Sequence, residues 1–298
     1  VPLLGLAIVL LVLVIIPHNP LAVTSGGATR WLNVGITTFQ PSEVAKFAVI
    51  LYFAATISVK KERMKTFQDG IFPYFLILGV ISVLMLMEPH LSGTVLILGI
   101  GASMMFVGGI SQKMVGLGVG IGVLGIAILA SGVLPYGQSR IMQWKDPWAY
   151  AADEGYQTVQ SLLAIGSGGL AGLGFGKGRQ KLMYLPEEHN DMIFAIVCEE
   201  LGFIGAALIL ALFCFLVLRG YWIAVHARDR FGGLLAVGII TMIAMQTFLN
   251  VAVVTNFVPN TGISLPFFSY GGTALLIQLF EMGVLLSVSR QMPGPKSG

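Results

Sequence analysis

Eight apolar runs recur along this 298-residue chain, and each is long enough to cross a lipid bilayer as a helix. Backbone groups inside hydrocarbon have no water to bond, so a spanning segment must satisfy its own hydrogen bonds, and barrel strands need only about ten residues. Hydrophobic residues make up 56% of the chain and charged residues 10%, far from the usage of soluble proteins. We therefore predict an all-α polytopic membrane protein, forming a single membrane domain over 1–298. The expected spans lie near 2–17, 41–59, 71–87, 91–109, 114–133, 192–218, 231–255 and 270–289.

Basic residues predict which ends of these spans face the cytoplasm. The loop 60–70, the short loops 110–113 and 219–230, and the tail after 289 lie on one side and are rich in Lys and Arg, as cytoplasmic loops are. The other side carries the large loop 134–191, where aromatic residues favour an ordered extracytoplasmic cap with short interfacial helices around Pro147 and over 156–164. Arg30 and Arg140 lie on this outer side. Cys198 and Cys214 fall within one span, so we expect free thiols.

The densest acidic cluster, Glu187-Glu188-His189-Asn190-Asp191, lies at the outer edge of a predicted span. An ionised carboxylate is costly near hydrocarbon, so acids at such a boundary face a water-filled cavity, a partner charge or a polar substrate. Glu199 and Glu200 follow on the same predicted helix, and at least one of them needs a polar partner, for which Lys46 is a candidate. The cluster predicts an active site embedded at the membrane surface.

Polar residues also open the second span, in Gln40-Pro41-Ser42-Glu43-Val44-Ala45-Lys46. Proline suits the first helical turn, and Glu43 and Lys46 are three residues apart on one helical face, where they can pair. This pair either holds helices together or lines a substrate cavity. In both cases it should point away from lipid.

A glycine-rich segment over 166–178 carries a lysine and tempts a nucleotide-binding interpretation. A P-loop requires glycine where this chain has Ala171 and Ser or Thr where it has Gly178, so we expect no nucleotide cofactor, and nothing indicates a redox cofactor. Lys177 and Arg179 could still bind a pyrophosphate, with glycine N–H groups close by. The alternative is a flexible turn above lipid headgroups.

The segment 262–273 precedes the last helix and contains Pro266, Ser269, Gly271 and Gly272. Proline interrupts regular backbone and paired glycines allow close approach, so an irregular or re-entrant element buried against protein is expected.

Together these motifs resemble the SEDS family (shape, elongation, division and sporulation), whose members include RodA, FtsW and SpoVE. The resemblance runs through Arg30-Trp31-Leu32, Phe39–Glu43, Ser167–Lys181, Leu185–Gly202 and Leu265–Gly272, and it is closer to the FtsW and SpoVE branch. One departure is Glu88-Pro89-His90-Leu91-Ser92-Gly93-Thr94, where many relatives have Gln-Pro-Asp-Leu-Gly-Thr. The family has ten transmembrane helices, which implies that the eight here are the third to tenth and that the chain is truncated at its N-terminus.

The resemblance implies a peptidoglycan glycosyltransferase in the bacterial cytoplasmic membrane, with its active site on the extracytoplasmic side. Its implied partners are lipid II, membrane lipids and a class B penicillin-binding protein, with no nucleic acid. Asp191 matches the family's catalytic aspartate and is the expected general base. A divalent cation, Mg²⁺ or Mn²⁺, could neutralise the leaving pyrophosphate, although no ligand spacing specifies a metal site. The expected substrate-binding residues are Arg30, Gln40, Ser42, Glu43, Lys46, Arg140, Lys177, Arg179, Glu187, His189, Ser269, Gly271 and Gly272.

Two alternatives stay open. A lipid II flippase would use the charges inside the spans, namely Glu43, Lys46, Glu199 and Glu281, as a polar pathway for the headgroup. A non-catalytic scaffold would only position a penicillin-binding protein, and it would tolerate the loss of Asp191. The sequence does not distinguish a role in division, sporulation or elongation.

Overall fold

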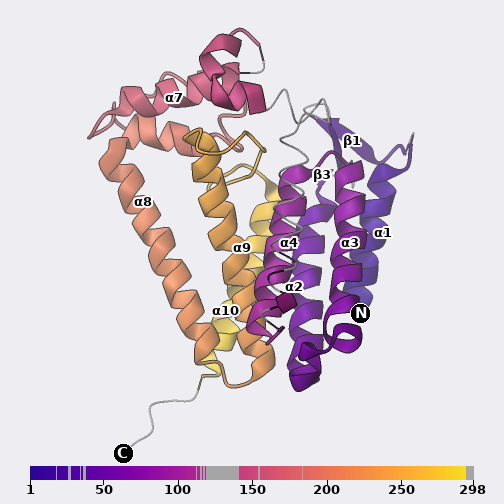
Figure 1. Ribbon diagram of the computed structural model, residues 1–298. Helices are drawn as coiled ribbons and strands as arrows, with labels where there is room; N and C mark the ends of the chain where they lie inside the picture. The colour runs from indigo at the N-terminus through magenta and orange to yellow at the C-terminus, as the bar shows by residue number, and fades with distance from the viewer. Residues whose placement is uncertain are drawn as a thin grey trace, which may run out of the picture. The chain divides into compact units, whose positions relative to one another are not determined.

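The computed structural model describes residues 1–17, 19–25, 28–33, 35, 38–111, 113–114, 116, 118, 141–153, 155–182 and 184–292. Seven of the eight predicted spans are helices there (Figure 1), and the fifth, 114–133, lies almost entirely outside the described residues. The seven helices are α1 (Pro2–Ile15), α2 (Pro41–Lys60), α3 (Phe72–Met87), α4 (Leu91–Val107), α8 (Ile193–Val225), α9 (Arg230–Val254) and α10 (Gly272–Arg290).

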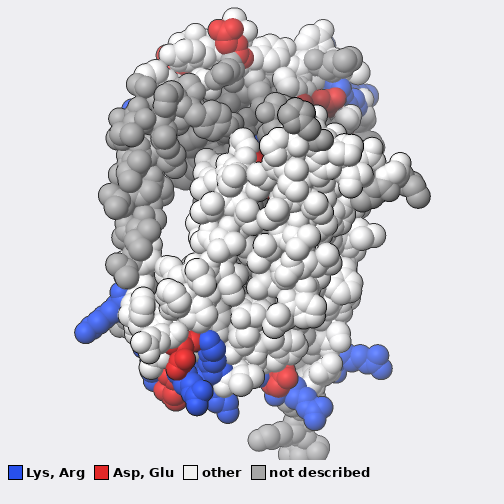
Figure 2. Space-filling model, turned by 90° about the vertical axis from the view of Figure 1, so that its right-hand side faces the viewer, with Lys and Arg blue, Asp and Glu red and all other residues white. Residues whose placement is uncertain are grey.

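Among the described residues, five helical segments are long and apolar enough to cross a membrane, and α1 and α4 are shorter apolar helices. Among the residues that Figure 2 describes, Lys, Arg, Asp and Glu gather at the lower end, and the broad white surface above them shows almost no charged atoms. A band of this kind can face lipid without burying charge. The predicted all-α polytopic class is confirmed.

Residues group into two compact units, which are described separately. Unit 1 comprises 1–115, 217–243 and 271–298, and unit 2 comprises 116–216 and 244–270. In unit 1, α2 packs against α1, α4 and α10, and α3 packs against α1 and α4. The ring of Phe53 meets the ring of Tyr74 edge-on at 4.8 Å between centroids, and both side chains are fully buried. Two short turns of helix, η1 (Lys61–Lys65) and η2 (Phe67–Ile71), join α2 to α3.

A small antiparallel sheet in unit 1 was not predicted from the sequence. Its strands β1 (Ala22–Ser25), β2 (Ala28–Asn33) and β3 (Thr38–Phe39) pair in the order β1-β2-β3, with Val23 opposite Trp31 and Leu32 opposite Phe39. The strands are too short to show a clear alternating pattern. The sheet carries Arg30 on β2 and leads through β3 into the start of α2.

Unit 2 contains most of the large loop. Its short helices η3 (Pro147–Tyr150) and α7 (Tyr156–Gly168) confirm that helices form around Pro147 and over 156–164, where the sequence predicts them. Hydrogen bonds tie this region to the end of α9, from the Trp144 indole N–H to the Asn256 carbonyl at 3.0 Å and from the Ser161 hydroxyl to the Val254 carbonyl at 2.8 Å. The described part of the loop is therefore ordered by specific contacts.

The long helix α8 is interrupted at Gly202, which has φ 65° and ψ −170°. In an unbroken helix the N–H groups of residues 203 and 204 would bond the carbonyls of residues 199 and 200. Here the Phe203 N–H donates to the Gly169 carbonyl at 2.9 Å and the Ile204 N–H donates to the Leu170 carbonyl at 3.1 Å. The segment after α7 thus supplies the two acceptors that the break removes.

The same segment also supplies the two missing donors. The Leu173 N–H bonds the Glu199 carbonyl and the Gly174 N–H bonds the Glu200 carbonyl, both at 3.0 Å. This exchange requires contact between backbones, because a Cβ at Gly172 would lie 2.1 Å from the Glu200 carbonyl oxygen. The glycine-rich segment is therefore a backbone insert that satisfies a broken helix, a substitution that membrane proteins use where irregular backbone is buried in protein.

Candidate active site

Asp191 lies in the turn that leads into α8, and its main chain is fixed by α9. The side-chain amide of Asn250 is fully buried and donates to the carbonyl oxygens of Asp191 and Ile263, each at 2.7 Å. One amide thus joins the start of α8 to the irregular segment after α9. Sequence analysis missed Asn250, although an amide within an otherwise apolar span was a signal that could have pointed to it.

The surroundings of the Asp191 carboxyl group suit it to proton transfer. Its Oδ1 atom is buried and has no hydrogen-bond partner among the described residues. Burial, with repulsion from Glu187 as the smaller cause, raises the pKa of Asp191 to about 7. A carboxyl group with this pKa is a proton acceptor matched to neutral pH.

The segment before α10 closes around the same turn. The Ser269 hydroxyl donates to the Asn190 carbonyl and accepts from the Leu265 N–H, both at 2.7 Å, and the Tyr270 N–H donates to the His189 carbonyl at 2.7 Å. The expected irregular element is confirmed. Ser269 has its hydroxyl engaged by backbone, which makes it a residue that shapes the turn.

Two other members of the acidic cluster are more open. Glu187 has a positive φ of 55° and accepts a hydrogen bond from the Asn190 amide. The His189 side chain is 70% exposed and lies 3.5 Å from a carboxylate oxygen of Glu188. Both remain accessible for contact with a substrate.

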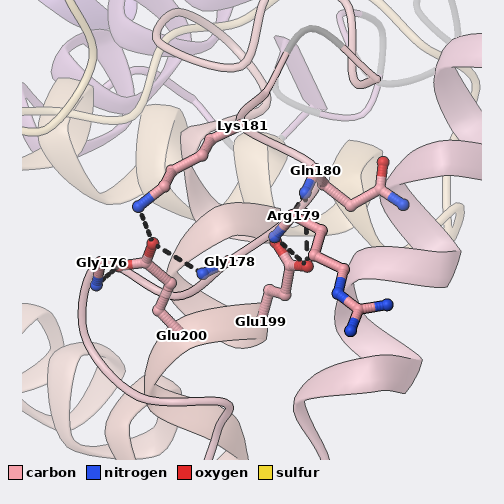
Figure 3. A network of polar contacts seen from close by, with 7 residues as sticks. All are labelled: Gly176, Gly178, Arg179, Gln180, Lys181, Glu199 and Glu200. Carbon is pink, nitrogen blue, oxygen red and sulfur yellow. Dashed lines mark hydrogen bonds and ion pairs between the residues drawn. The ribbon is translucent and has the colours of Figure 1, made fainter.

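Glu199 and Glu200 find their partners in the glycine-rich segment (Figure 3). The Glu199 carboxylate accepts from the N–H groups of Arg179, at 2.8 Å, and Gln180, and the Glu200 carboxylate accepts from Lys181 Nζ at 2.6 Å. The N–H groups of Gly176 and Gly178 also donate to Glu200, at 2.9 and 3.2 Å.

This network corrects two expectations. The polar partners of Glu199 and Glu200 are backbone N–H groups and Lys181. Lys46, the candidate partner, pairs with Glu43 instead. Of the glycine N–H groups expected near a pyrophosphate, those of Gly176 and Gly178 bond the Glu200 carboxylate and that of Gly174 bonds the Glu200 carbonyl. For an anion this leaves the exposed side chains of Lys177 and Arg179.

In unit 1, the predicted Glu43–Lys46 pair is confirmed, with Nζ 2.8 Å from Oε1 and both side chains buried. Glu281 of α10 is also fully buried, and neither carboxylate oxygen has a hydrogen-bond partner among the described residues. Gln40 is the N-cap of α2 and Ser42 is buried in its first turn. The start of α2 thus gathers polar groups away from the surface, as expected.

Arg30 contacts the turn between α3 and α4, where its guanidinium donates to the carbonyls of Glu88, at 3.3 Å, and Pro89. Burial raises the pKa of Glu88 to about 8, opposed by the charge of Arg30. Gly271 and Gly272 stand at the N-terminus of α10.

The structure brings the expected residues into two groups. Unit 2 holds Lys177, Arg179, Glu187, His189, Asp191 and Ser269, and unit 1 holds Arg30, Gln40, Ser42, Glu43, Lys46, Gly271 and Gly272. Arg140 lies outside the described residues. In the described part of the chain no three His, Cys, Asp or Glu residues gather as metal ligands. Cys198 and Cys214 are free thiols, as expected.

Comparison with known proteins identifies the family of this chain. The family model described as "Cell cycle protein" (FtsW/RodA/SpoVE) matches residues 2–293. The chain is 42% identical to a probable peptidoglycan glycosyltransferase FtsW of Geobacter sp. (strain M18), covering 96% of this chain and 77% of the relative. It is 43% identical to stage V sporulation protein E of Bacillus subtilis (strain 168), covering 94% and 76%.

Solved structures agree. A chain from a peptidoglycan synthase complex, described as coordinating polymerization and crosslinking, superposes with a TM-score of 0.79 at 26% identity, covering 99% of this chain and 81% of that one. The rod shape determining protein RodA of Thermus thermophilus superposes with a TM-score of 0.69 at 26% identity, covering 99% and 78%. This chain is therefore a multi-pass membrane protein that belongs to the FtsW/RodA/SpoVE family of cell cycle proteins.

Proposed function

We propose that this chain is a peptidoglycan glycosyltransferase that polymerises lipid II on the outer face of the bacterial cytoplasmic membrane. The observation that supports it best is Asp191, whose buried Oδ1 has no partner among the described residues and whose pKa is raised to about 7. The relatives described as probable peptidoglycan glycosyltransferases agree with this chemistry.

In the proposed reaction, Asp191 accepts the proton of a sugar hydroxyl on the acceptor as that oxygen attacks the anomeric carbon of the donor. The bond from that carbon to the pyrophosphate oxygen breaks, and the polyprenyl pyrophosphate leaves with the bonding electrons. Attack from the face opposite the leaving group inverts the anomeric configuration. General base catalysis of this kind contributes about 10²–10⁴-fold to a rate.

The leaving pyrophosphate gains negative charge, so cations near it stabilise the transition state. Lys177 and Arg179 suit this role because both are exposed and, within the described part of unit 2, neither is paired with a carboxylate. Arg30 and Arg140 are further candidates from the sequence. The sequence also predicts substrate contacts at the polar start of α2.

We also propose a class B penicillin-binding protein as partner. The support is the solved synthase complex, whose description joins polymerization to crosslinking. Crosslinking requires a transpeptidase, and we propose that the penicillin-binding protein supplies it.

A lipid II flippase is the second candidate, and one observation favours it. Glu43, Lys46 and Glu281 are all buried in unit 1. Ionisable residues buried within membrane spans often mark a polar pathway. A flippase should depend on these residues and move lipid II without making polymer.

The test is to purify the full-length protein with its cognate penicillin-binding protein, block the transpeptidase, supply lipid II and compare glycan products. Wild type should make polymer, Asp191→Asn should make little, and Asp69→Asn should match wild type because Asp69 lies in the linker η2. The asparagine variant must still form an intact complex. Equal polymer from the wild type and the Asp191 variant would remove Asp191 as the base, and lipid movement without polymer would favour the flippase.

A further inference from the structure

We infer that Glu199 and Glu200 are positioning residues, which hold the loop Gly174–Lys181 in the shape that presents Lys177 and Arg179 to the pyrophosphate of a polyprenyl-linked substrate. The inference rests on the proposed function, since it assigns a role in binding the lipid substrate of that reaction. We call Gly174–Lys181 the cationic loop.

The two carboxylates accept hydrogen bonds from four backbone N–H groups of the cationic loop. Glu200 accepts from Gly176 and Gly178, and Glu199 accepts from Arg179 and Gln180. Hydrogen bonds from backbone to an ionised acceptor are about twice as strong as neutral ones. Four donors within five residues therefore fix the path of the loop from one side.

Because the backbone N–H groups turn toward the carboxylates, the intervening side chains are free to turn outward. Lys177 and Arg179 are both exposed, whereas Gly178 between them is buried. Figure 3 shows the Arg179 guanidinium directed away from both carboxylates, while Lys181 reaches back to Glu200. Of the three cations in the loop, Lys181 pairs with Glu200, and Lys177 and Arg179 are left exposed.

The break in α8 sets the position of the whole arrangement. The carbonyls of Glu199 and Glu200 bond the N–H groups of Leu173 and Gly174, so the same two residues hold the loop by main chain and by side chain. A Cβ at Gly178 would lie 2.7 Å from Oε2 of Glu199, which shows how closely the loop approaches. A shift of either carboxylate must therefore move Lys177 and Arg179.

The charge of the displayed pair suits a pyrophosphate. Arg binds phosphate oxygens through two parallel N–H donors, and Lys adds a point charge. Glu199 and Glu200 are 1% and 8% exposed, and two adjacent buried carboxylates are costly to desolvate. Each carboxylate accepts hydrogen bonds at both of its oxygens, whereas the amide of a glutamine has one acceptor oxygen and would turn an NH2 group toward the loop.

The test measures binding of undecaprenyl pyrophosphate to the full-length protein in nanodiscs, which needs no turnover. Glu200→Gln should raise the Kd about tenfold, because it loses the ion pair with Lys181 and weakens the bonds to the loop. Lys177→Gln should raise the Kd by a similar factor. The double variant should be little weaker than either single one, since coupled residues are not additive.

Glu62→Gln is the matched control, because it makes the same change at an exposed ion pair with Lys65 and should leave the Kd unchanged. A Kd in Glu200→Gln equal to that of the control, or factors that multiply in the double variant, would overturn the inference, as would absence of binding by wild type. If Glu200→Gln does not fold, Lys181→Gln removes the same ion pair from its partly exposed side, and the same outcomes decide.

The two proposals fail separately. Asp191→Asn should lose polymer in the lipid II assay and keep the wild-type Kd. Retained polymer would remove the proposed base and leave the binding result standing, whereas an unchanged Kd in Glu200→Gln would remove only the positioning role.

Discussion

Replacing Gly172 with alanine tests the backbone insert in α8 most directly. Gly172 has φ 80°, and a Cβ there would lie 2.1 Å from the Glu200 carbonyl oxygen and 2.7 Å from the Gly202 nitrogen. Neither contact can be relieved by turning a side chain, because both neighbouring atoms belong to the backbone. The insert and α8 must separate to admit the methyl group.

The glycine-rich segment also contains a matched control position. Gly176 has φ 78°, almost the same conformation, but a Cβ there would meet nothing within 4 Å. Alanine at either position pays the left-handed penalty of about 1 kcal/mol. Gly172→Ala should in addition lose the bonds from Leu173 and Gly174 to α8, at about 1 kcal/mol each, for a total of about 3 kcal/mol.

The assay follows thermal exposure of a buried thiol. Cys198 is 7% exposed, and its carbonyl oxygen lies against Gly168, so a thiol-reactive dye reports opening of this region. Cys214 is exposed and is replaced by serine in every variant. Gly176→Ala should label slightly below the temperature of the parent and Gly172→Ala well below it. Equal shifts in the two variants would refute the close backbone contact, since only conformational strain would then remain.

Three further predictions concern the site and the buried charges. Because the charge of Glu187 helps to raise the pKa of Asp191 to about 7, polymerisation should rise as pH increases through 7, and Glu187→Gln should move this rise in the pH–rate profile to lower pH. Lys46→Ala should destabilise the protein by about 3 kcal/mol in thermal unfolding, because it leaves Glu43 buried and unpaired, while Lys65→Ala at an exposed pair should change little. Asn250→Ala should lower the polymerisation rate more than it weakens substrate binding, because it frees the main chain of Asp191, and an unchanged rate would show that this bond does not orient the base.

Sequence analysis predicted the helices well because their signal is local. Each span is an apolar run, and Pro41 marks the start of α2 in the first turn, where proline lacks only a donor that would be unpaired in any case. The Glu43–Lys46 pair was predictable for the same reason, since both residues lie on one helix at fixed spacing. Asp191 emerged as a candidate because its acidic cluster stands at the edge of a span.

The partners of Glu199 and Glu200 could not be predicted in this way. Their acceptors are filled by backbone N–H groups, which every residue except proline carries and which leave no mark in a sequence. Sequence analysis therefore offered a side-chain cation, Lys46, although it also predicted that Lys46 pairs with Glu43. The sheet β1–β3 was missed because its strands are short and lie between two strongly apolar runs.

The break at Gly202 explains why a segment that does not match a P-loop is nevertheless rich in glycine. A helix that loses two consecutive bonds needs two donors and two acceptors from another backbone, and these must approach closer than any Cβ permits. Gly172 and Gly202 meet that demand from opposite sides, with a Cβ at Gly202 lying 2.3 Å from the Gly172 nitrogen. The glycines therefore serve the protein's own helix, and in the anion site that we propose the side chains of Lys177 and Arg179 replace the N–H groups that such segments often use.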